Sequence, residues 1–394
     1  MSYGVRERLL DGERSSVQYA VLAAVLVAAP FLVGPFETRL LTEVLIFAVF
    51  ATAFNLLYGY TGLLSFGHAM FVAAAGYTLA QFVKNGSSAL GFPDLFGGAS
   101  VLVTFVVAVV LAVLVATLLA VVVGYLSVQL QEIYFAMITL SFSMAVFVVA
   151  NQNIGGLTNG SDGLSFILGR VDLFGVEFTL MNIRDPIVYY FVVLAVFAAA
   201  MYALWRVVNS PFGMICTAIR ENPERAEALG INETFHSWMT FIVSGAFSGL
   251  AGALLVPLRT GITPDLAYWS FSAEPVIMTV IGGPYSFAGP AVGAFVYEYL
   301  REFINSYPTL ANRWQFAFGF VLLLVVLFFD NGVAGGIERL RAWLGETGEH
   351  YREGGFAAVV SFARASVVRR VASARDAVTG RPAGRERERK PSDD

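Results

Sequence analysis

Lysine is nearly absent from this 394-residue sequence, in which Lys84 and Lys390 are the only examples. Neither lysine follows the G-x-x-x-x-G frame that a Walker-type phosphate-binding loop requires. The chain therefore has no means of binding ATP through such a loop. If it takes part in an ATP-driven process, another subunit must bind the nucleotide.

Cysteine and histidine are scarce as well. Cys216 is the only cysteine, which excludes an internal disulfide and a cysteine-based metal site. The three histidines, His68, His236 and His350, lie far apart and lack the spacing of metal ligands. No paired nucleophile and base is recognisable. We therefore expect no catalytic centre, no metal site and no bound cofactor in this chain.

Charged residues make up only 14% of the sequence, and 57% of the residues are hydrophobic. Soluble domains carry about 25% charged residues. A helix needs about 20 apolar residues to span a bilayer, and the apolar runs here supply about ten such segments. The sequence therefore predicts an all-α polytopic membrane protein with about ten transmembrane helices. We expect membrane lipid around it and no nucleic-acid partner.

The chain divides by composition into three parts. Residues 1–16 form a polar N-terminal segment, and residues 17–336 form the transmembrane domain, with a polar loop at 209–235. Residues 337–394 form a tail that begins with an amphipathic helical pattern and ends in a charged, disordered stretch. We expect spans at about 17–33, 40–58, 59–84, 100–128, 133–150, 187–208, 237–258, 269–281, 293–305 and 314–329. Residues 85–98 and 151–185 are expected to be loops.

Basic residues are distributed unevenly over the polar segments. Residues 151–185 carry four acidic residues against two arginines, and the shorter stretch 209–232 carries Arg220 and Arg225. Cytoplasmic loops are enriched in Lys and Arg, so we expect 151–185 outside and 209–232 inside. Arginines before the first span and after the last one predict cytoplasmic termini. Two termini on one side require an even number of crossings, so the short segment 269–281 counts as one.

Residues 209–232, NSPFGMICTAIRENPERAEALGIN, form the longest run within the apolar body that mixes both charge signs. Asn222 can cap a helix, and Pro223 fits the first helical position. Gly230 stands where a left-handed residue ends a helix. The stretch therefore predicts a short helix with defined ends.

Within this predicted helix, Glu224 and Glu227 suit the positive N-terminal end. Ala226 and Leu229, three residues apart, form one small apolar face. Two interpretations remain open: an ordinary polar loop between spans, and a docking helix for a cytoplasmic partner. The candidate docking residues are Arg220, Glu221, Asn222, Pro223, Glu224, Arg225, Ala226, Glu227, Leu229 and Gly230.

Glycine interrupts two apolar segments, residues 59–77 and residues 282–290. Glycines allow close packing of membrane helices, and unwound backbone at this depth survives only inside protein or beside a wet cavity. Tight packing explains the pattern as well as a pathway does. One such segment in each half of the chain favours a central pathway. The candidate pathway residues are Asn55, Thr61, Ser65, His68, Gly283 and Ser286.

Six phrases of the sequence carry a resemblance to a known family. They are NLLYGYTGLLSFGHAMF (55–71), IYFAMITLSF (133–142), GLTNGSDGL (156–164), SPFGMICTAIRENPERAEALGI (210–231), FIVSGAFSGLAGALL (241–255) and VIGGPYSFAGPAVGAF (280–295). In these phrases the chain resembles the permeases of ABC importers for branched-chain amino acids, in particular their M-type subunit. The resemblance covers residues 40–330 in order and spacing.

The resemblance implies a mechanism and partners. In this family the loop matching 209–232 holds a coupling helix that sits in a groove of an ATPase subunit, and the run Arg225–Gly230 resembles the family's EAA…G signature. The implied partners are ABC ATPase subunits that bind ATP and Mg, a second, H-type permease and an extracytoplasmic substrate-binding protein. The implied location is a prokaryotic plasma membrane. The sequence departs from the family at Gln129 and Gln131, where relatives tend to carry Arg.

Two other functions remain open. A permease for urea or short-chain amides is the nearest alternative, since the pathway residues do not distinguish the substrates. An ion-gradient transporter would need a membrane-embedded relay, for which Glu43, His68, Glu274 and Glu298 are the candidates. Most of these lie near the predicted span ends, which favours interfacial positions over a midplane relay.

Overall fold

The structure is a computed structural model that describes residues 21, 23–130, 132–166, 168–173, 176–180 and 186–307, together with 316, 319, 323 and 332. The chain divides into two compact units, Met1–Ala334 and Gly335–Asp394, and every described residue belongs to the first. The predicted N-terminal segment 1–16, most of the last predicted span and the tail lie outside the described residues.

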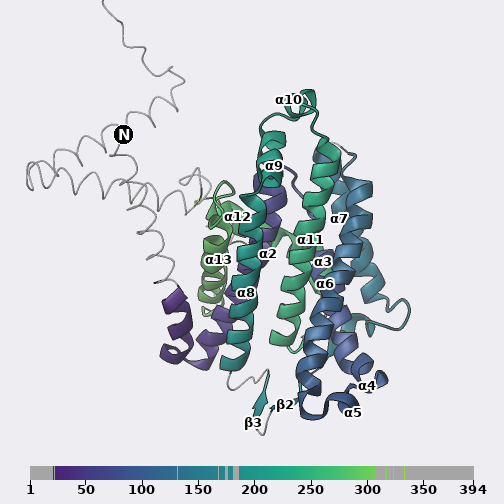
Figure 1. Cartoon of the computed structure of the whole chain (residues 1–394), viewed down its shortest axis with the longest axis vertical. Helices are drawn as coiled ribbons and strands as arrows, with labels where there is room; N and C mark the ends of the chain where they lie inside the picture. Colours follow the sequence, from purple (N-terminus) through teal and green to yellow (C-terminus); the bar gives the residue numbers. More distant parts are fainter. Residues whose placement is uncertain are drawn as a thin grey trace, which may run out of the picture. The chain divides into compact units, whose positions relative to one another are not determined.

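Helices dominate the described part of the chain (Figure 1). The helices are α2 (Pro35–Thr61), α3 (His68–Gln81), α4 (Ser87–Ala89), α5 (Phe92–Phe96), α6 (Ser100–Ser127), α7 (Glu132–Asn151), α8 (Ile187–Val208), α9 (Pro211–Glu221), α10 (Pro223–Ala228), α11 (Glu233–Leu258), α12 (Trp269–Gly282) and α13 (Gly289–Asn305). Single π or 3-10 turns are η1 (Phe82–Gly86), η2 (Gly97–Ala99), η3 (Gly160–Asp162) and η4 (Pro264–Ala267).

Five helical segments of the described chain are long and apolar enough to cross a membrane: Pro35–Thr61, Phe92–Ser127, Ile133–Asn151, Ile187–Val208 and Glu233–Leu258. Shorter helices, α3, α12 and α13, account for three further predicted crossings. The all-α polytopic fold with interrupted segments is thus confirmed, and the count of ten remains approximate.

The long helices differ in burial. In the most apolar stretch of α2, 89% of the residues are buried inside the protein, against 28% in the segment that contains α6. The corresponding stretch of α11 is 72% buried. Since a lipid-facing helix keeps an exposed apolar side, α2 and α11 form the centre of the bundle and α6, α7 and α8 its periphery.

Small residues bring α11 close to α6 and α3. A Cβ on Gly249 would lie 2.3 Å from the Ala116 Cβ of α6, and one on Gly252 would lie 2.5 Å from the Val72 carbonyl oxygen of α3. Four fully buried alanines line α6 at intervals of four residues: Ala108, Ala112, Ala116 and Ala120. Packing of small residues is a common means of association between membrane helices, because backbones can then approach closely.

Two segments predicted as loops contain short elements. Residues 85–98 hold α4 and α5 instead of an irregular loop. Residues 151–185 hold strands β1 (Leu164–Ser165), β2 (Arg170–Leu173) and β3 (Val176–Thr179). Strands β2 and β3 pair with each other, and β1 pairs with β4 (Gly261–Ile262) beyond α11, both antiparallel. Strands β2 (RVDL) and β3 (VEFT) do alternate polar and apolar residues, but over only four positions each, which is a weak signal in the sequence.

The two ends of the bundle are built differently. Helix α10 lies at one end of the long helices, and β2, β3, α4 and α5 lie at the other (Figure 1). Helix α2 ends at Thr61 on the α10 side, where Gly62 adopts a left-handed φ of +85°, and six residues pass before α3 begins at His68. Helices α12 and α13 are likewise separated by a turn that starts at Gly283, with φ +107°.

Candidate functional site

The predicted docking stretch folds into two helices, α9 and α10, at one end of the bundle (Figure 1). The sequence predicted only the second. Helix α9 begins after an extended Ser210 with Pro211 in the first turn. Its buried positions are Gly213, Cys216 and Ile219. This spacing of three places them on one helical face, which is the signal that sequence reasoning missed.

Helix α10 has the ends that the sequence predicted. The Asn222 side-chain oxygen accepts a hydrogen bond from the Arg225 amide at 2.8 Å. At the other end Gly230 has φ +84°, and its amide donates to the Glu227 carbonyl at 2.8 Å. The next amide, of Ile231, donates to the Ala226 carbonyl at 3.2 Å. This pair of bonds is a Schellman cap, so a six-residue helix is fixed at both ends.

The predicted apolar face of α10 is wrong. Ala226 is 2% exposed, whereas Leu229 is 77% exposed, so the two side chains do not share an environment. Helix α10 ends at Ala228, so Leu229 is the C-cap residue and lies outside the regular helix. Glu224, Arg225 and Glu227 are exposed as well. The outer surface of α10 thus presents one leucine among charges of both signs.

Arg220 connects α9 to the interrupted segments. Its guanidinium donates to the Gly59 carbonyl near the end of α2, and its Nη2 lies 2.6 Å from Glu221 Oε1. The same guanidinium lies 5.1 Å from the ring centroid of Tyr285, in the turn between α12 and α13. Its stem packs on Gly62, where a Cβ would lie 3.2 Å from Arg220 Cγ. One side chain therefore contacts both interruptions.

A second contact joins α9 to α11. Cys216 Sγ lies 3.2 Å from Thr240 Oγ1, and both side chains are fully buried. Burial raises the pKa of the Cys216 thiol. The cysteine is therefore an inert packing residue of this joint. Helix α9 is thus attached to both α2 and α11.

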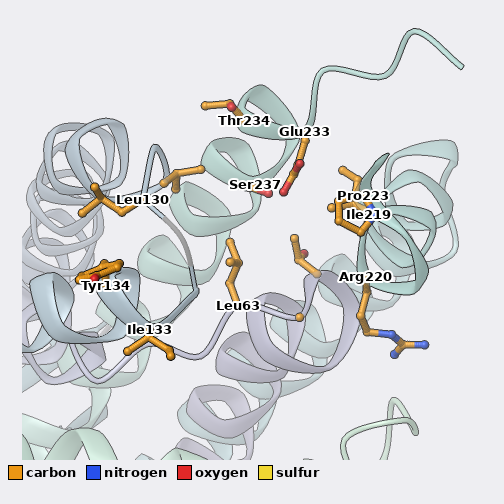
Figure 2. A pocket seen from close by; sticks show the side chains of 13 residues that line it. Leu63, Leu130, Ile133, Tyr134, Ile219, Arg220, Pro223, Glu233, Thr234 and Ser237 are labelled. Atoms are coloured by element: carbon orange, nitrogen blue, oxygen red, sulfur yellow. The ribbon is translucent and has the colours of Figure 1, made fainter. Parts of the chain in front are cut away.

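A cavity of about 470 Å³ opens beside these helices (Figure 2). Its apolar wall comprises Leu63, Leu130, Ile133 and Tyr134, and its polar wall comprises Glu233, Thr234 and Ser237. In Figure 2 the Arg220 guanidinium points away from these side chains. Pro223 of α10 and Thr61, one of the predicted pathway residues, also line the cavity.

The other pathway candidates lie near this end or deeper. Asn55 is fully buried, and its side-chain nitrogen and oxygen have no hydrogen-bond partner among the described residues. A Cβ on Gly59 would approach both the Asn55 amide and the Pro284 carbonyl, so Asn55 is close to the α12–α13 turn. In that turn the Ser286 amide donates to the Gly283 carbonyl at 3.4 Å.

His68 and Ser65 lie where α3 begins. The His68 ring is fully buried between Phe54, Phe71 and Phe241, with centroid distances of 5.1, 5.7 and 6.2 Å. Its Nε2 lies 2.8 Å from Ser244 Oγ. Ser65 Oγ accepts from the Gly67 amide at 3.2 Å. These contacts are those of packed residues, and a pathway role for the six candidates stays a prediction.

The carboxylates considered for an ion relay lie elsewhere. Glu43 Oε1 is 2.7 Å from Arg259 Nη2, and Glu298 Oε2 is 3.5 Å from Arg301 Nη1. His68 bonds to Ser244 instead of any of these groups. Within the described residues, then, no hydrogen-bonded relay joins the histidine to the carboxylates.

Residues 38–327 match the family described as branched-chain amino acid transport system / permease component. This chain belongs to that permease family. The match begins in the first turn of α2 and extends beyond α13, so it includes α9, α10 and both interrupted segments. The first 37 residues and the tail are outside it.

Individual relatives agree with the family match. The permease is 26% identical over 344 residues to the high-affinity branched-chain amino acid transport system permease protein LivM of Salmonella typhimurium, covering 82% of this chain and 76% of the relative. It is 24% identical over 298 residues to LivH of Escherichia coli, covering 73% and 91% of the two chains. No solved structure matches it.

Proposed function

We propose that this permease is the M-type transmembrane subunit of an ATP-driven ABC importer for branched-chain amino acids. Its family and the names of its LivM and LivH relatives support the substrate class. The absence of a Walker-type loop from the sequence supports the proposal that partner ATPase subunits bind ATP and Mg. The chain itself then carries out no chemistry and supplies a pathway that alternates between two packings.

The single observation that carries the coupling mechanism is the position of Arg220. Helix α10 offers an exposed face with Leu229 and mixed charges, and burying one leucine on a partner is worth about 1.5–3 kcal/mol. Force on α10 passes directly to α9, because one residue, Asn222, separates them. Arg220 then transmits it to the end of α2 and to the α12–α13 turn. Both interruptions shift together.

The sidedness follows from this assignment. The α10 end is cytoplasmic and meets the ATPase, as the arginine distribution also favours. Strands β2 and β3 and helices α4 and α5 lie at the opposite end (Figure 1). This end faces a substrate-binding protein outside the plasma membrane of a prokaryote. A second, H-type permease completes the pathway. Both termini are cytoplasmic.

Single cysteines test this sidedness. Cysteines at Ser87 and Ser161 should react with a membrane-impermeant thiol reagent from outside, and one at Glu224 only from inside. The parent chain is a suitable background, since buried Cys216 should stay unlabelled. Labelling at Glu224 from outside would invert the topology and remove the docking role of α10.

Reconstitution tests the function itself. The purified chain in liposomes should accumulate no leucine, isoleucine or valine under a proton or sodium gradient. Accumulation should require the ATPase subunits, the H-type permease, the binding protein and ATP together. Gradient-driven uptake by the chain alone would overturn the proposal and favour an ion-gradient transporter. Uptake of urea instead of leucine by the complete assembly would favour the permease for urea or short-chain amides.

A further inference from the structure

A second cavity, of about 440 Å³, lies at the end of α2 opposite to Arg220. It is lined by Arg39, Glu43, Arg259, Glu274, Arg301 and Asn305. These residues come from the first turns of α2, the end of α11, α12 and α13. Five of the six are charged although the surrounding helices are apolar. Charges in such positions are costly unless they are paired or have a function.

Part of this charge is neutralised within the protein. Glu43 Oε1 is 2.7 Å from Arg259 Nη2 and 3.8 Å from Arg301 Nη2. Arg301 also pairs with Glu298, whose side chain is 1% exposed, at 3.5 Å. Two arginines and two carboxylates therefore satisfy one another. This group is a structural frame for the cavity.

Arg39 and Glu274 are left over from this pairing. Within the described residues Arg39 takes part in no ion pair, and its Nη2 donates to the Leu258 carbonyl at 3.2 Å. Glu274 also has no ion pair in the described part of the chain. Tyr297 donates to its carboxylate, but Oε2 is buried and accepts no hydrogen bond. One cation and one anion, neither of them in a close ion pair among the described residues, thus line the same cavity, and Arg301 and Arg259 act on Glu274 electrostatically from farther away.

This arrangement matches one class of ligand. When all of them are ionised, the charges of three arginines and three carboxylates balance, which favours a ligand that is itself neutral but carries both charges. Arginine is well suited to a carboxylate, because its planar fork binds both oxygens, and a carboxylate accepts from an ammonium group. The cavity volume lies within the range of about 300–1,000 Å³ typical of small-molecule sites.

We propose that this cavity binds the carboxylate and ammonium groups of a free amino acid, with Arg39 on the carboxylate and Glu274 on the ammonium. The proposal rests on the proposed function, and it assigns the first contact of the substrate to the end of the permease away from α10. A phospholipid with a phosphate and a primary ammonium in its head group shares the chemistry, so the experiment must separate the two sources.

The test uses the full-length chain in phosphatidylcholine nanodiscs, whose lipid has no N–H donor. Saturation-transfer NMR measures binding of leucine, of leucinamide, which lacks the carboxylate, and of 4-methylpentanoate, which lacks the ammonium. We expect leucine to bind at least about tenfold more tightly than either analogue, since a hydrogen bond to a charged group is lost in each case. Equal binding of all three overturns the proposal without any mutation.

Two substitutions assign the groups. Arg39→Gln should weaken leucine to the level of leucinamide and leave leucinamide unchanged. Glu274→Gln should weaken leucine to the level of 4-methylpentanoate. Glu37→Gln, two residues before Arg39 and outside the cavity lining, is the control and should bind like the parent. Leucine affinity unchanged in both cavity variants would overturn the assignment.

The lipid source is tested by adding phosphatidylethanolamine to the nanodiscs and by native mass spectrometry. The proposal would be overturned by two results together: the chain retains phosphatidylethanolamine, and leucine fails to bind even in phosphatidylcholine nanodiscs. The cavity would then be a lipid site. The outcome is separable from the proposed function. ATP-dependent leucine uptake by the complete assembly would persist if only this inference failed.

Discussion

Arginine has different partners at the two ends of α2. At the α10 end Arg220 reaches a backbone carbonyl and an aromatic ring, with one exposed carboxylate beside it. At the other end Arg259 and Arg301 pair with Glu43 and Glu298. The first arrangement joins α9 to the end of α2 and to the α12–α13 turn. The second ties α2, α11 and α13 together around a cavity. Under the proposed function, the first end transmits motion and the second holds the helices in position.

The largest effect should come from removing the transmitting surface. Replacing residues 223–229 with a flexible Gly/Ser linker of equal length should abolish substrate-stimulated ATP hydrolysis. The reason is that no rigid helix remains to dock on the ATPase subunit. Insertion and thermal stability of the chain should change little, since only Ala226 of α10 is buried. ATPase rates of the assembled transporter are the measurement. Retained stimulation would show that α10 does not couple.

A smaller effect is expected when α10 stays and its connection is cut. Arg220→Gln removes a charged hydrogen bond worth about 1.5–3 kcal/mol, so transport should fall ten- to a hundredfold while ATPase binding persists. The matched control is Arg206→Gln, an exposed arginine in the last turn of α8. If Arg206→Gln reduced transport as much as Arg220→Gln does, the loss would not be specific to the contacts of Arg220 with α2 and the α12–α13 turn.

At the opposite end the same kind of change should affect stability instead of coupling. Glu43→Gln leaves Arg259 without its ion-pair partner and Arg301 with Glu298 alone. The pair is only partly buried, so we expect a loss of about 1–3 kcal/mol, below that of a fully buried pair. Thermal unfolding in detergent measures it, with Glu37→Gln as the control. Equal melting temperatures would mean that the ion pairs do not hold this end together.

The same contrast explains what the sequence could predict. The ends of α10 depend on Asn222, Pro223 and Gly230, which act on residues three to five positions away. Local rules therefore predicted them, as hydrophobic length predicted the boundaries of α8. Glu43 and Arg259 are 216 positions apart, and no local pattern connects them. The sequence drew attention to Glu43 alone, as a carboxylate near a predicted span end, and gave no reason to pair it with Arg259.

Leu229 and His68 illustrate a further limit. Periodicity placed Leu229 on a face with Ala226, but it does not include the end of a helix only six residues long. His68 was a candidate for the pathway and for an ion relay, because a histidine is costly to bury among apolar residues. The cost is reduced by Ser244, which lies 176 positions away and supplies its hydrogen bond. The prediction for His68 lacked its distant partner Ser244, and the prediction for Leu229 lacked the end of α10.

The smallest effect should come from removing the N-terminal cap of α10, a change that should affect coupling at this end and leave the other end of α2 unaltered. Asn222→Ala removes the bond to the Arg225 amide and should cost the helix about 1 kcal/mol. Because α10 then frays for part of the time, substrate-stimulated ATPase activity should fall several-fold, with no change in the stability of the α13 end. Asn222→Ser keeps a capping oxygen and should restore most of the activity. Ala and Ser variants of equal activity would mean that the rigidity of α10 is irrelevant to coupling, and that only its exposed surface matters.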